Sequence, residues 1–152
     1  MTVHRTAEPE SGSASLRDRK LDVKIALGGL WTAMLFVYAY VDIFGFFRAD
    51  VIEGALAGRI SSGAGFEIDQ TFLLLTTIFV TIPILMIVVS LLAPARVNRP
   101  VNLVVSLIYA ASAAASAVGE TWVYYVVGTA VEVLLMLAVV RSAWTWPRDV
   151  AR

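Results

Sequence analysis

Four long apolar stretches constrain this chain more than any other feature of its sequence. Each is long enough to cross a hydrocarbon core as an α-helix, which takes about 20 residues. Because no water is present in the bilayer core, each stretch must satisfy its own peptide groups, and the short alternating strands of a barrel are absent. We therefore expect an all-α fold, an integral membrane four-helix bundle within residues 25–140. The expected spans are residues 25–47, 71–92, 101–118 and 122–140.

The composition also favours a membrane protein. Of the 152 residues, 59% are hydrophobic and 16% are charged, whereas soluble domains hold about 45–50% apolar and about 25% charged residues. A soluble fold would have to expose the excess as large apolar patches, which are rare on monomers. The first stretch is too long for the core of a secretory signal, so we expect it to remain as an anchor.

The inventory of reactive side chains excludes several classes of function. The chain has no cysteine, which excludes thiolate nucleophiles, Cys-ligated zinc and iron–sulfur clusters. The one histidine, His4, lies in a polar N-terminal stretch, so we expect neither a haem ligand in the membrane nor a Ser-His-Asp triad. The zero net charge argues against nucleic acid as a partner. We predict no catalytic residues, no metal site and no cofactor.

The distribution of lysine and arginine predicts the orientation. One side has most of the basic residues, and the other has Arg48 and Arg59 among several acids. We therefore expect both termini in the cytoplasm, with charged tails at residues 1–24 and 141–152, and a disordered start of the first tail. The abundance of arginine, alanine and valine hints at a bacterial cytoplasmic membrane. The basic residues on the cytoplasmic side are Arg17, Arg19, Lys20, Lys24, Arg96, Arg99, Arg141, Arg148 and Arg152.

The loops predict how the spans connect. The outer loop between spans one and two has an amphipathic pattern at residues 49–60, which predicts a short helix on the membrane or over the bundle. That helix either seals the bundle or serves as a lid or docking surface. Residues 61–65 resemble a flexible connector. We expect Pro94 and Pro100 to bracket the inner loop, and Gly119 to start a tight hairpin between spans three and four.

Two acids lie within the expected spans, where an ionisable group costs roughly 2.5–3.5 kcal/mol at mid-helix. Glu132 falls about 15 Å below the outer interface, near the midplane, and Asp42 falls about 7–8 Å below it. Because these depths differ, the two acids need not touch. The hairpin brings Tyr109 level with Glu132, so a hydroxyl of Tyr109 or Thr129 could bond a carboxyl group that apolar burial keeps protonated.

Three roles remain open for these acids: a hydrogen bond between helices, a proton relay or substrate site, and pairing with a charge on a partner subunit. The polar candidates for binding or structure are Asp42, Glu132, Tyr38, Tyr40, Tyr109, Tyr125 and Thr129.

Small residues indicate close helix packing. Residues 110–117 are all alanine or serine, which lets helix backbones approach in lipid, either within the chain or against another chain. Pro83 removes the donor for the carbonyl of Phe79, and nearby threonines could satisfy the backbone instead. The predicted packing positions are Gly45, Ala111, Ser112, Ala115, Ser116 and Gly128.

The most distinctive string is Tyr-Val-Asp-Ile-Phe-Gly-Phe-Phe at residues 40–47. It predicts either an anchored helix end or an edge that recognises a lipid or a protein. With the four spans and the basic approach to the first span, this string resembles an uncharacterised family of small four-span bacterial membrane proteins, frequent in actinobacteria. The resemblance covers residues 20–140 and implies no established activity, so it supplies no catalytic residue.

Two functions fit these observations better than a membrane enzyme does, because no nucleophile–base pair is visible. The first is a non-catalytic accessory subunit of a larger membrane complex, such as a lipid transporter of the mammalian cell entry type. The alternative is a small proton-coupled transporter that acts as a homo-oligomer, with Glu132 as the titrating group. The expected partners are membrane lipids and either other membrane subunits or further copies of the chain.

Overall fold

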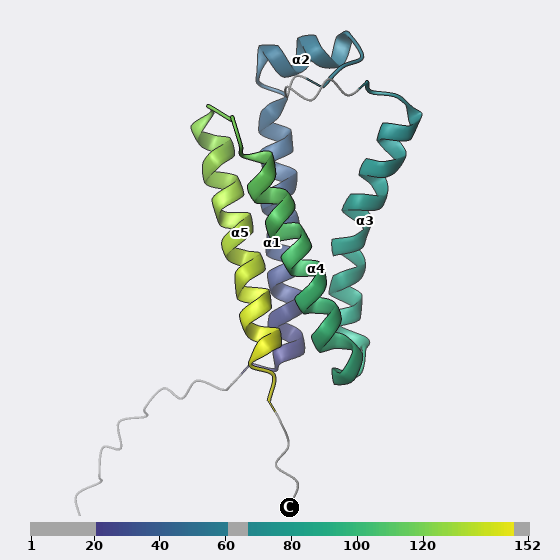
Figure 1. Cartoon of the computed structure of the whole chain (residues 1–152), viewed down its shortest axis with the longest axis vertical. Coiled ribbons are helices and arrows are strands. Elements are labelled where there is room, and N and C mark those ends of the chain that lie inside the picture. The colour runs from purple at the N-terminus through teal and green to yellow at the C-terminus, as the bar shows by residue number, and fades with distance from the viewer. Residues whose placement is uncertain (1–20, 61–66, 148–152) are drawn as a thin grey trace, which may run out of the picture.

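A computed structural model describes residues 21–60 and 67–147 of the chain. In these ranges the protein is all-α, as predicted, with no strand. Figure 1 shows the long helices side by side and the short helix α2 across one end. The helices are α1 (Val23–Gly45), α2 (Ala49–Leu56), α3 (Gln70–Leu92), α4 (Ala95–Ser116) and α5 (Val123–Trp144).

Three of the described helices, α1, α3 and α5, are long and apolar enough to cross a membrane. Helix α4 matches α5 in length, at 22 residues. Its first turns, however, contain Arg96, Asn98 and Arg99, which lower its hydropathy. Three segments therefore have the length and apolar character that the expectation requires, and a crossing by α4 stays a prediction.

The helix ends depart from the expected spans. The carboxylate of Asp22 accepts a hydrogen bond from the backbone N–H of Lys24 at 2.8 Å, which starts α1 earlier than expected. Pro94, in an extended conformation, is the residue that precedes α4, so this helix begins at Ala95. The expectation that Pro100 closes the inner loop was wrong, because Pro100 lies inside α4. The helix continues through Pro100 although this residue has no N–H to donate to the carbonyl of Arg96.

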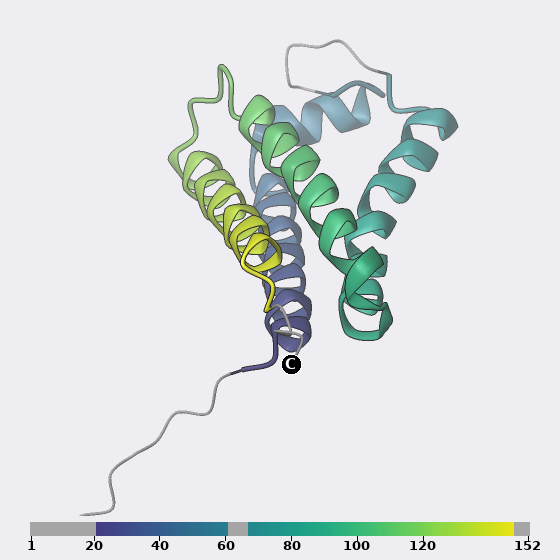
Figure 2. The same ribbon diagram turned by 60° about the horizontal axis from the view of Figure 1, so that its bottom comes forward.

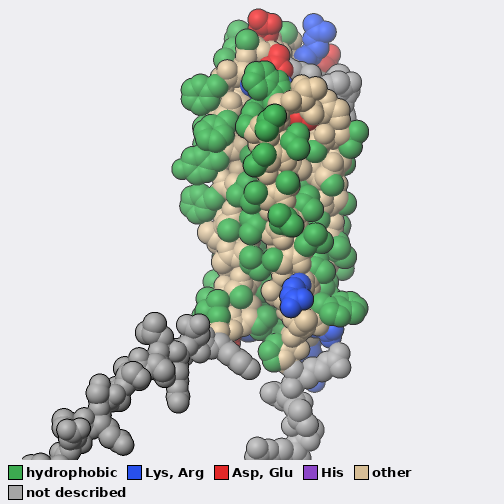
Figure 3. Space-filling view, turned by 90° about the vertical axis from the view of Figure 1, so that its left-hand side faces the viewer, with side chains coloured by type: hydrophobic (Ala, Val, Ile, Leu, Met, Phe, Trp, Pro, Cys, Tyr) green, Lys and Arg blue, Asp and Glu red, His purple; other side chains and the backbone are tan. Residues whose placement is uncertain are grey.

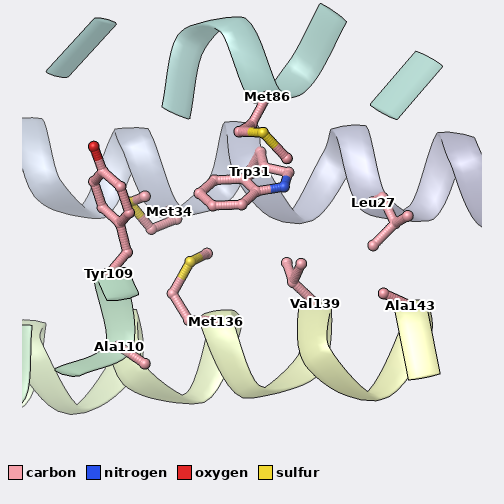
Figure 4. Packing of buried hydrophobic residues seen from close by; sticks show 9 residues of the cluster. All are labelled: Leu27, Trp31, Met34, Met86, Tyr109, Ala110, Met136, Val139 and Ala143. Atoms are coloured by element: carbon pink, nitrogen blue, oxygen red, sulfur yellow. The ribbon is translucent and has the colours of Figure 1, made fainter. Parts of the chain in front are cut away.

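The core lies toward the end of the bundle where α1 begins. Helix α1 packs between α5 and α3, and α4 packs along α5. Figures 1 and 2 show α3 leaning away from the other long helices toward the end occupied by α2. Accordingly, residues 71–78 of α3 contain no buried side chain. Figure 4 shows Trp31 of α1 between Met86 of α3 and the α5 residues Met136 and Val139.

A buried polar network joins three helices within this core. The indole N–H of Trp31 donates to the side-chain oxygen of Asn102 at 2.7 Å, and the hydroxyl of Ser90 donates to the same oxygen at 3.2 Å. The Asn102 amide donates in turn to the side-chain oxygen of Asn98 at 2.7 Å. These bonds connect α1, α3 and α4, and every fully buried side-chain nitrogen or oxygen in the described residues has a partner.

Two glycines mark the closest helix contacts. A Cβ atom at Gly128 of α5 would lie 2.3 Å from a Val41 methyl group of α1. A Cβ atom at Gly28 of α1 would lie 3.3 Å from the Leu91 side chain of α3. Gly29, in contrast, has nothing within 4 Å of such an atom. Helix α1 therefore approaches α5 so closely that only a glycine fits at position 128 without movement.

Charged side chains gather at the two ends of the bundle, and hydrophobic side chains cover the middle of the face in Figure 3. The end where α1 begins has Lys24, Arg96, Arg99 and Arg141 among the described residues. Several sequence-based expectations lie wholly or partly outside the described residues: most of the N-terminal tail, the connector at residues 61–65, and the last residues of the C-terminal tail.

Candidate functional site

A cavity of about 120 Å³ lies inside the bundle between α1, α3, α4 and α5. One water takes about 30 Å³ in the liquid, so the cavity has room for about four waters. Both acids of the expected spans, Asp42 and Glu132, line it, although they come from different helices and different expected depths. Its polar lining consists of Tyr38, Asp42, Tyr109, Ser112, Ser116, Tyr125, Thr129 and Glu132.

The two acids of this cavity differ in their exposure. Asp42 is an exposed residue, three positions before the end of α1 at Gly45. Glu132 lies in the middle of α5 and is only 6% exposed. Ser116, at the end of α4, is exposed like Asp42. The cavity therefore has its mouth toward the end of the bundle where α2 lies, and Glu132 lies deeper inside it.

Glu132 has no hydrogen bond and no ion pair within the described part of the chain. Its carboxyl group nevertheless lines the cavity, where space remains beside it. No lysine, arginine or histidine is among the lining residues. A carboxyl group that is buried, unpaired and beside an open volume is available to a ligand or a proton.

The hydroxyl groups expected to bond Glu132 do not do so in the described structure. The Tyr109 hydroxyl donates instead to the backbone carbonyl of Phe79 in α3. Thr129 is buried on the cavity wall beside Glu132, without a hydrogen bond to it. The expected rescue of the Phe79 carbonyl by threonines was also wrong, because the hydroxyl of Thr81 bonds the carbonyl of Thr77 at 2.7 Å.

Aromatic rings form much of the cavity wall. The ring of Tyr109 stacks on Phe79 with 4.7 Å between centroids, and Trp31 meets the edge of Tyr109 at 6.1 Å. Tyr38 of α1 lies 6.3 Å from Phe79. This stacking connects α1, α3 and α4 at the level of the cavity.

The remaining predicted residues lie apart from this site or only beside it. Tyr40 is 55% exposed and contacts Phe44 of the same helix at 6.1 Å between ring centroids. Ala111 and Ala115 are exposed on α4, whereas Ser112 lines the cavity. A Cβ atom at Gly45 would lie 3.8 Å from the Tyr124 hydroxyl.

An ion-pair cluster links the ends of the helices beside the cavity mouth. The guanidinium group of Arg48, which follows α1, contacts the carboxylate of Asp50 in α2 at 2.7 Å and that of Glu120 at 3.1 Å. The same group lies over the ring of Trp122, 4.7 Å from its centroid. We call these four residues the Arg48 clasp. The clasp joins α1, α2 and the turn between α4 and α5.

The clasp shifts the ionisation of its acids. The hydrogen bond from Arg48 holds the pKa of Asp50 below its ordinary value. Partial burial raises the pKa of Glu120, but the backbone N–H of Trp122 and the Arg48 guanidinium outweigh this effect, so the pKa is lowered. Both carboxyl groups therefore remain charged partners of Arg48 at neutral pH.

The profile of a family of unknown function, DUF6326, matches residues 18–152. The chain belongs to the DUF6326 family. This finding confirms the expectation of an uncharacterised family, while the motif at residues 40–47 stays a prediction. Searches of the curated proteins and of the solved structures gave no significant match.

Sequence reasoning missed several residues that shape the site of this DUF6326 protein. Asn98, Asn102 and Ser106 are fully buried, and their spacing of four positions places them on one face of α4. That spacing is a signal that a helical wheel of residues 95–116 would have revealed. The pairing of Arg48 with Glu120, in contrast, joins positions 72 residues apart and depends on the tertiary fold.

Proposed function

We propose that this DUF6326 protein is a small proton-coupled transporter whose solute site is the cavity containing Asp42 and Glu132. The observation that supports this proposal is the convergence of two acids from α1 and α5 on one cavity without a basic side chain among its lining residues. Acids within membrane spans are costly and commonly mark proton or ion pathways. All of the lining residues that we describe belong to a single copy of the chain.

The coupling follows from charge neutralisation. An ionised Glu132 at the buried end of the cavity requires a compensating charge, because an isolated carboxylate in apolar surroundings is strongly unfavourable. A proton or a bound solute supplies that compensation, and the two therefore exclude one another. Exchange of a proton for a solute at one carboxyl group is the simplest form of coupled antiport.

The titratable groups that face Glu132 are few. Helix α1 contributes Asp42 and Tyr38, helix α4 contributes Tyr109, and α5 contributes Tyr125. Helix α3 contributes the ring of Phe79. Asp42 is thus the other carboxyl group of the described cavity lining, and it stands at the mouth, where protons and solutes would enter.

The proposal includes a four-span topology in a bacterial cytoplasmic membrane. Helix α4 runs antiparallel beside α5 and matches it in length, which favours a crossing by α4 as well (Figure 1). The described basic residues at the end where α1 begins favour the cytoplasm on that side, and hence cytoplasmic termini. Helix α2 and the cavity mouth would then face outward.

The absence of cysteine gives a direct test of this topology. Single cysteines replace Glu53 in α2 or Thr145 after α5, and intact cells are treated with a membrane-impermeant maleimide. We expect labelling of E53C in intact cells and of T145C only after permeabilisation. The opposite pattern would overturn the orientation, and labelling of both from outside would overturn the four-span topology.

Proteoliposomes test the transport proposal. The protein is reconstituted with an imposed pH gradient, and uptake is measured for labelled choline, glycine betaine and 3,3-dimethylbutanoate, which are a cation, a zwitterion and an anion. We expect gradient-driven uptake of at least one probe, with loss in Glu132→Gln. Glu53→Gln, an exposed acid of α2, is the matched control and should transport normally. The proposal fails if Glu132→Gln transports like the unaltered protein or if no probe responds to the gradient.

A second candidate function is that of an accessory subunit in a larger complex, such as a lipid transporter of the mammalian cell entry type. The exposed small residues Ala111 and Ala115 on α4 favour this alternative, because small residues allow another helix to pack closely. Affinity purification in mild detergent from the native host, followed by mass spectrometry, tests it. Stoichiometric recovery of another membrane protein, lost in the double variant A111L/A115L and kept in Val104→Leu, would support this role.

A further inference from the structure

We propose that the ligand of the Asp42–Glu132 cavity is a small organic cation, namely an ammonium group with short apolar substituents. This inference rests on the proposed transport function and specifies its substrate class. The inference depends first on the Glu132 side chain, which has no hydrogen bond or ion pair among the described residues, is 6% exposed and lines the cavity. A group in this position is suited to receive a charge from a ligand.

The charge of the cavity lining selects against anions. Its carboxyl groups come from Asp42 and Glu132, and no described lining residue is basic. Arg48 is outside the lining, and its guanidinium group is already bonded to Asp50 and Glu120. Arg48 therefore provides little positive charge to offset the carboxyl groups of the cavity. A cation gains from both carboxylates, whereas an anion is repelled by them.

The aromatic lining favours an ammonium group. Tyr38, Tyr109, Tyr125 and Phe79 all line the cavity, and the faces of such rings attract organic cations. The stacking of Tyr109 on Phe79 fixes two of these rings before any ligand arrives. A preformed aromatic wall needs little reorganisation on binding.

The apolar part of the lining distinguishes an organic cation from a metal ion. Met34, Met136 and Val41 line the same volume and provide contacts for methyl or methylene groups. Calcium and magnesium ions, in contrast, prefer about six or more oxygen ligands. Within the described residues no group of three or more acidic, histidine or cysteine side chains could hold such an ion.

The size of the cavity limits the ligand. A volume of about 120 Å³ equals the liquid volume of about four waters, which limits the ligand to a small compound. Choline is a small ammonium compound of this kind, and 3,3-dimethylbutan-1-ol has the same shape with a neutral carbon in place of the nitrogen. This pair isolates the contribution of the positive charge.

Calorimetric titration of the purified full chain in detergent tests the inference. We expect choline to bind at mildly alkaline pH, and the neutral alcohol to bind at least roughly tenfold more weakly. Glu132→Gln should weaken choline binding by a similar factor, whereas Glu53→Gln should leave it unchanged. Equal affinity for the two compounds, or no choline binding to the folded protein, would overturn the inference. Sodium binding that depends on Glu132, without choline binding, would also overturn it.

A cysteine at the cavity mouth reports where the cation binds. This experiment does not depend on a Glu132 variant, which could lose binding because it misfolds. Choline should slow maleimide labelling of S116C, because Ser116 lines the cavity, and should not affect T145C at the other end of the bundle. Equal labelling of S116C with and without choline would contradict binding in the cavity.

Glu132-dependent uptake of the zwitterion or the anion alone would overturn this inference and leave the transport proposal intact. Choline binding without any gradient-driven uptake would support this inference and remove the transport proposal.

Discussion

The hydroxyl group of Tyr109 donates a hydrogen bond to the backbone carbonyl of Phe79, the carbonyl that Pro83 deprives of its helical donor. This bond connects α4 to α3, two helices that are also joined by the Ser90–Asn102 bond. The Tyr109 ring also stacks on the Phe79 side chain at 4.7 Å. One tyrosine therefore compensates for the proline and fixes the leaning helix α3 to the bundle.

Removing this hydroxyl should destabilise the protein more when Pro83 is present than when it is replaced. We expect Tyr109→Phe to lower the free energy of unfolding in SDS by about 1 kcal/mol, as is typical for a hydrogen bond in a membrane protein. Pro83→Ala restores an N–H that reaches the Phe79 carbonyl, so Tyr109→Phe should cost less in that background. An equal cost in both backgrounds would show that the bond does not compensate for the proline.

The contact between Gly128 and Val41 predicts a size limit at the α1–α5 interface. A Cβ atom at position 128 lies 2.3 Å from a Val41 methyl group, so Gly128→Ala forces the helices apart. We expect a loss of about 1–3 kcal/mol in the same SDS assay. Gly29→Ala, which meets open space, is the matched control and should be neutral. Adding Val41→Ala to Gly128→Ala should restore part of the lost stability. If it restores none, the Val41 contact is not the source of the strain.

Much of the architecture follows from hydropathy alone, because a helix in lipid must be long and apolar. The sequence therefore locates α1, α3 and α5 closely, and it predicts their helical state. The first turns of α4 were harder to predict from the sequence, since Arg96, Asn98 and Arg99 are characteristic of a loop. The side chains of Asn98 and Arg99 gain partners only once the other helices are in place, as in the bond from Arg99 to the carbonyl of Ala143 at 3.2 Å.

The candidate site could be predicted in its residue types but not in its arrangement. Depth along each helix separates Asp42 from Glu132, yet a cavity that extends along the bundle includes both. Depth also placed Tyr109 beside Glu132, but the hydroxyl bonds Phe79 instead. An unsatisfied carbonyl in an apolar core competes strongly for any nearby donor, and the sequence does not show which helix faces Pro83.

Asn102 should be important for the stability of the folded protein, because two buried donors depend on its side-chain oxygen. Its oxygen accepts from Trp31 at 2.7 Å and from Ser90 at 3.2 Å. Asn102→Leu leaves both buried donors unpaired, which costs roughly 1–3 kcal/mol. We expect the SDS unfolding midpoint to fall accordingly, whereas Thr76→Val, which removes an exposed hydroxyl bonded within its own helix, should have little effect. A stable Asn102→Leu variant would indicate that other groups or water satisfy these donors.

The Arg48 clasp should make stability depend on acid pH. Its acids, Asp50 and Glu120, have lowered pKa values, so the folded state binds fewer protons than the unfolded state near their ordinary values of 3.8 and 4.5. The stabilisation is therefore present at neutral pH and is lost as the pH falls through the lowered pKa values. We expect the melting temperature in detergent to fall between about pH 5 and pH 3. In Arg48→Gln the melting temperature should be lower at neutral pH and should fall less on acidification. Arg59→Gln, on the same loop, is the control, and an unchanged acid response in Arg48→Gln would contradict the assignment.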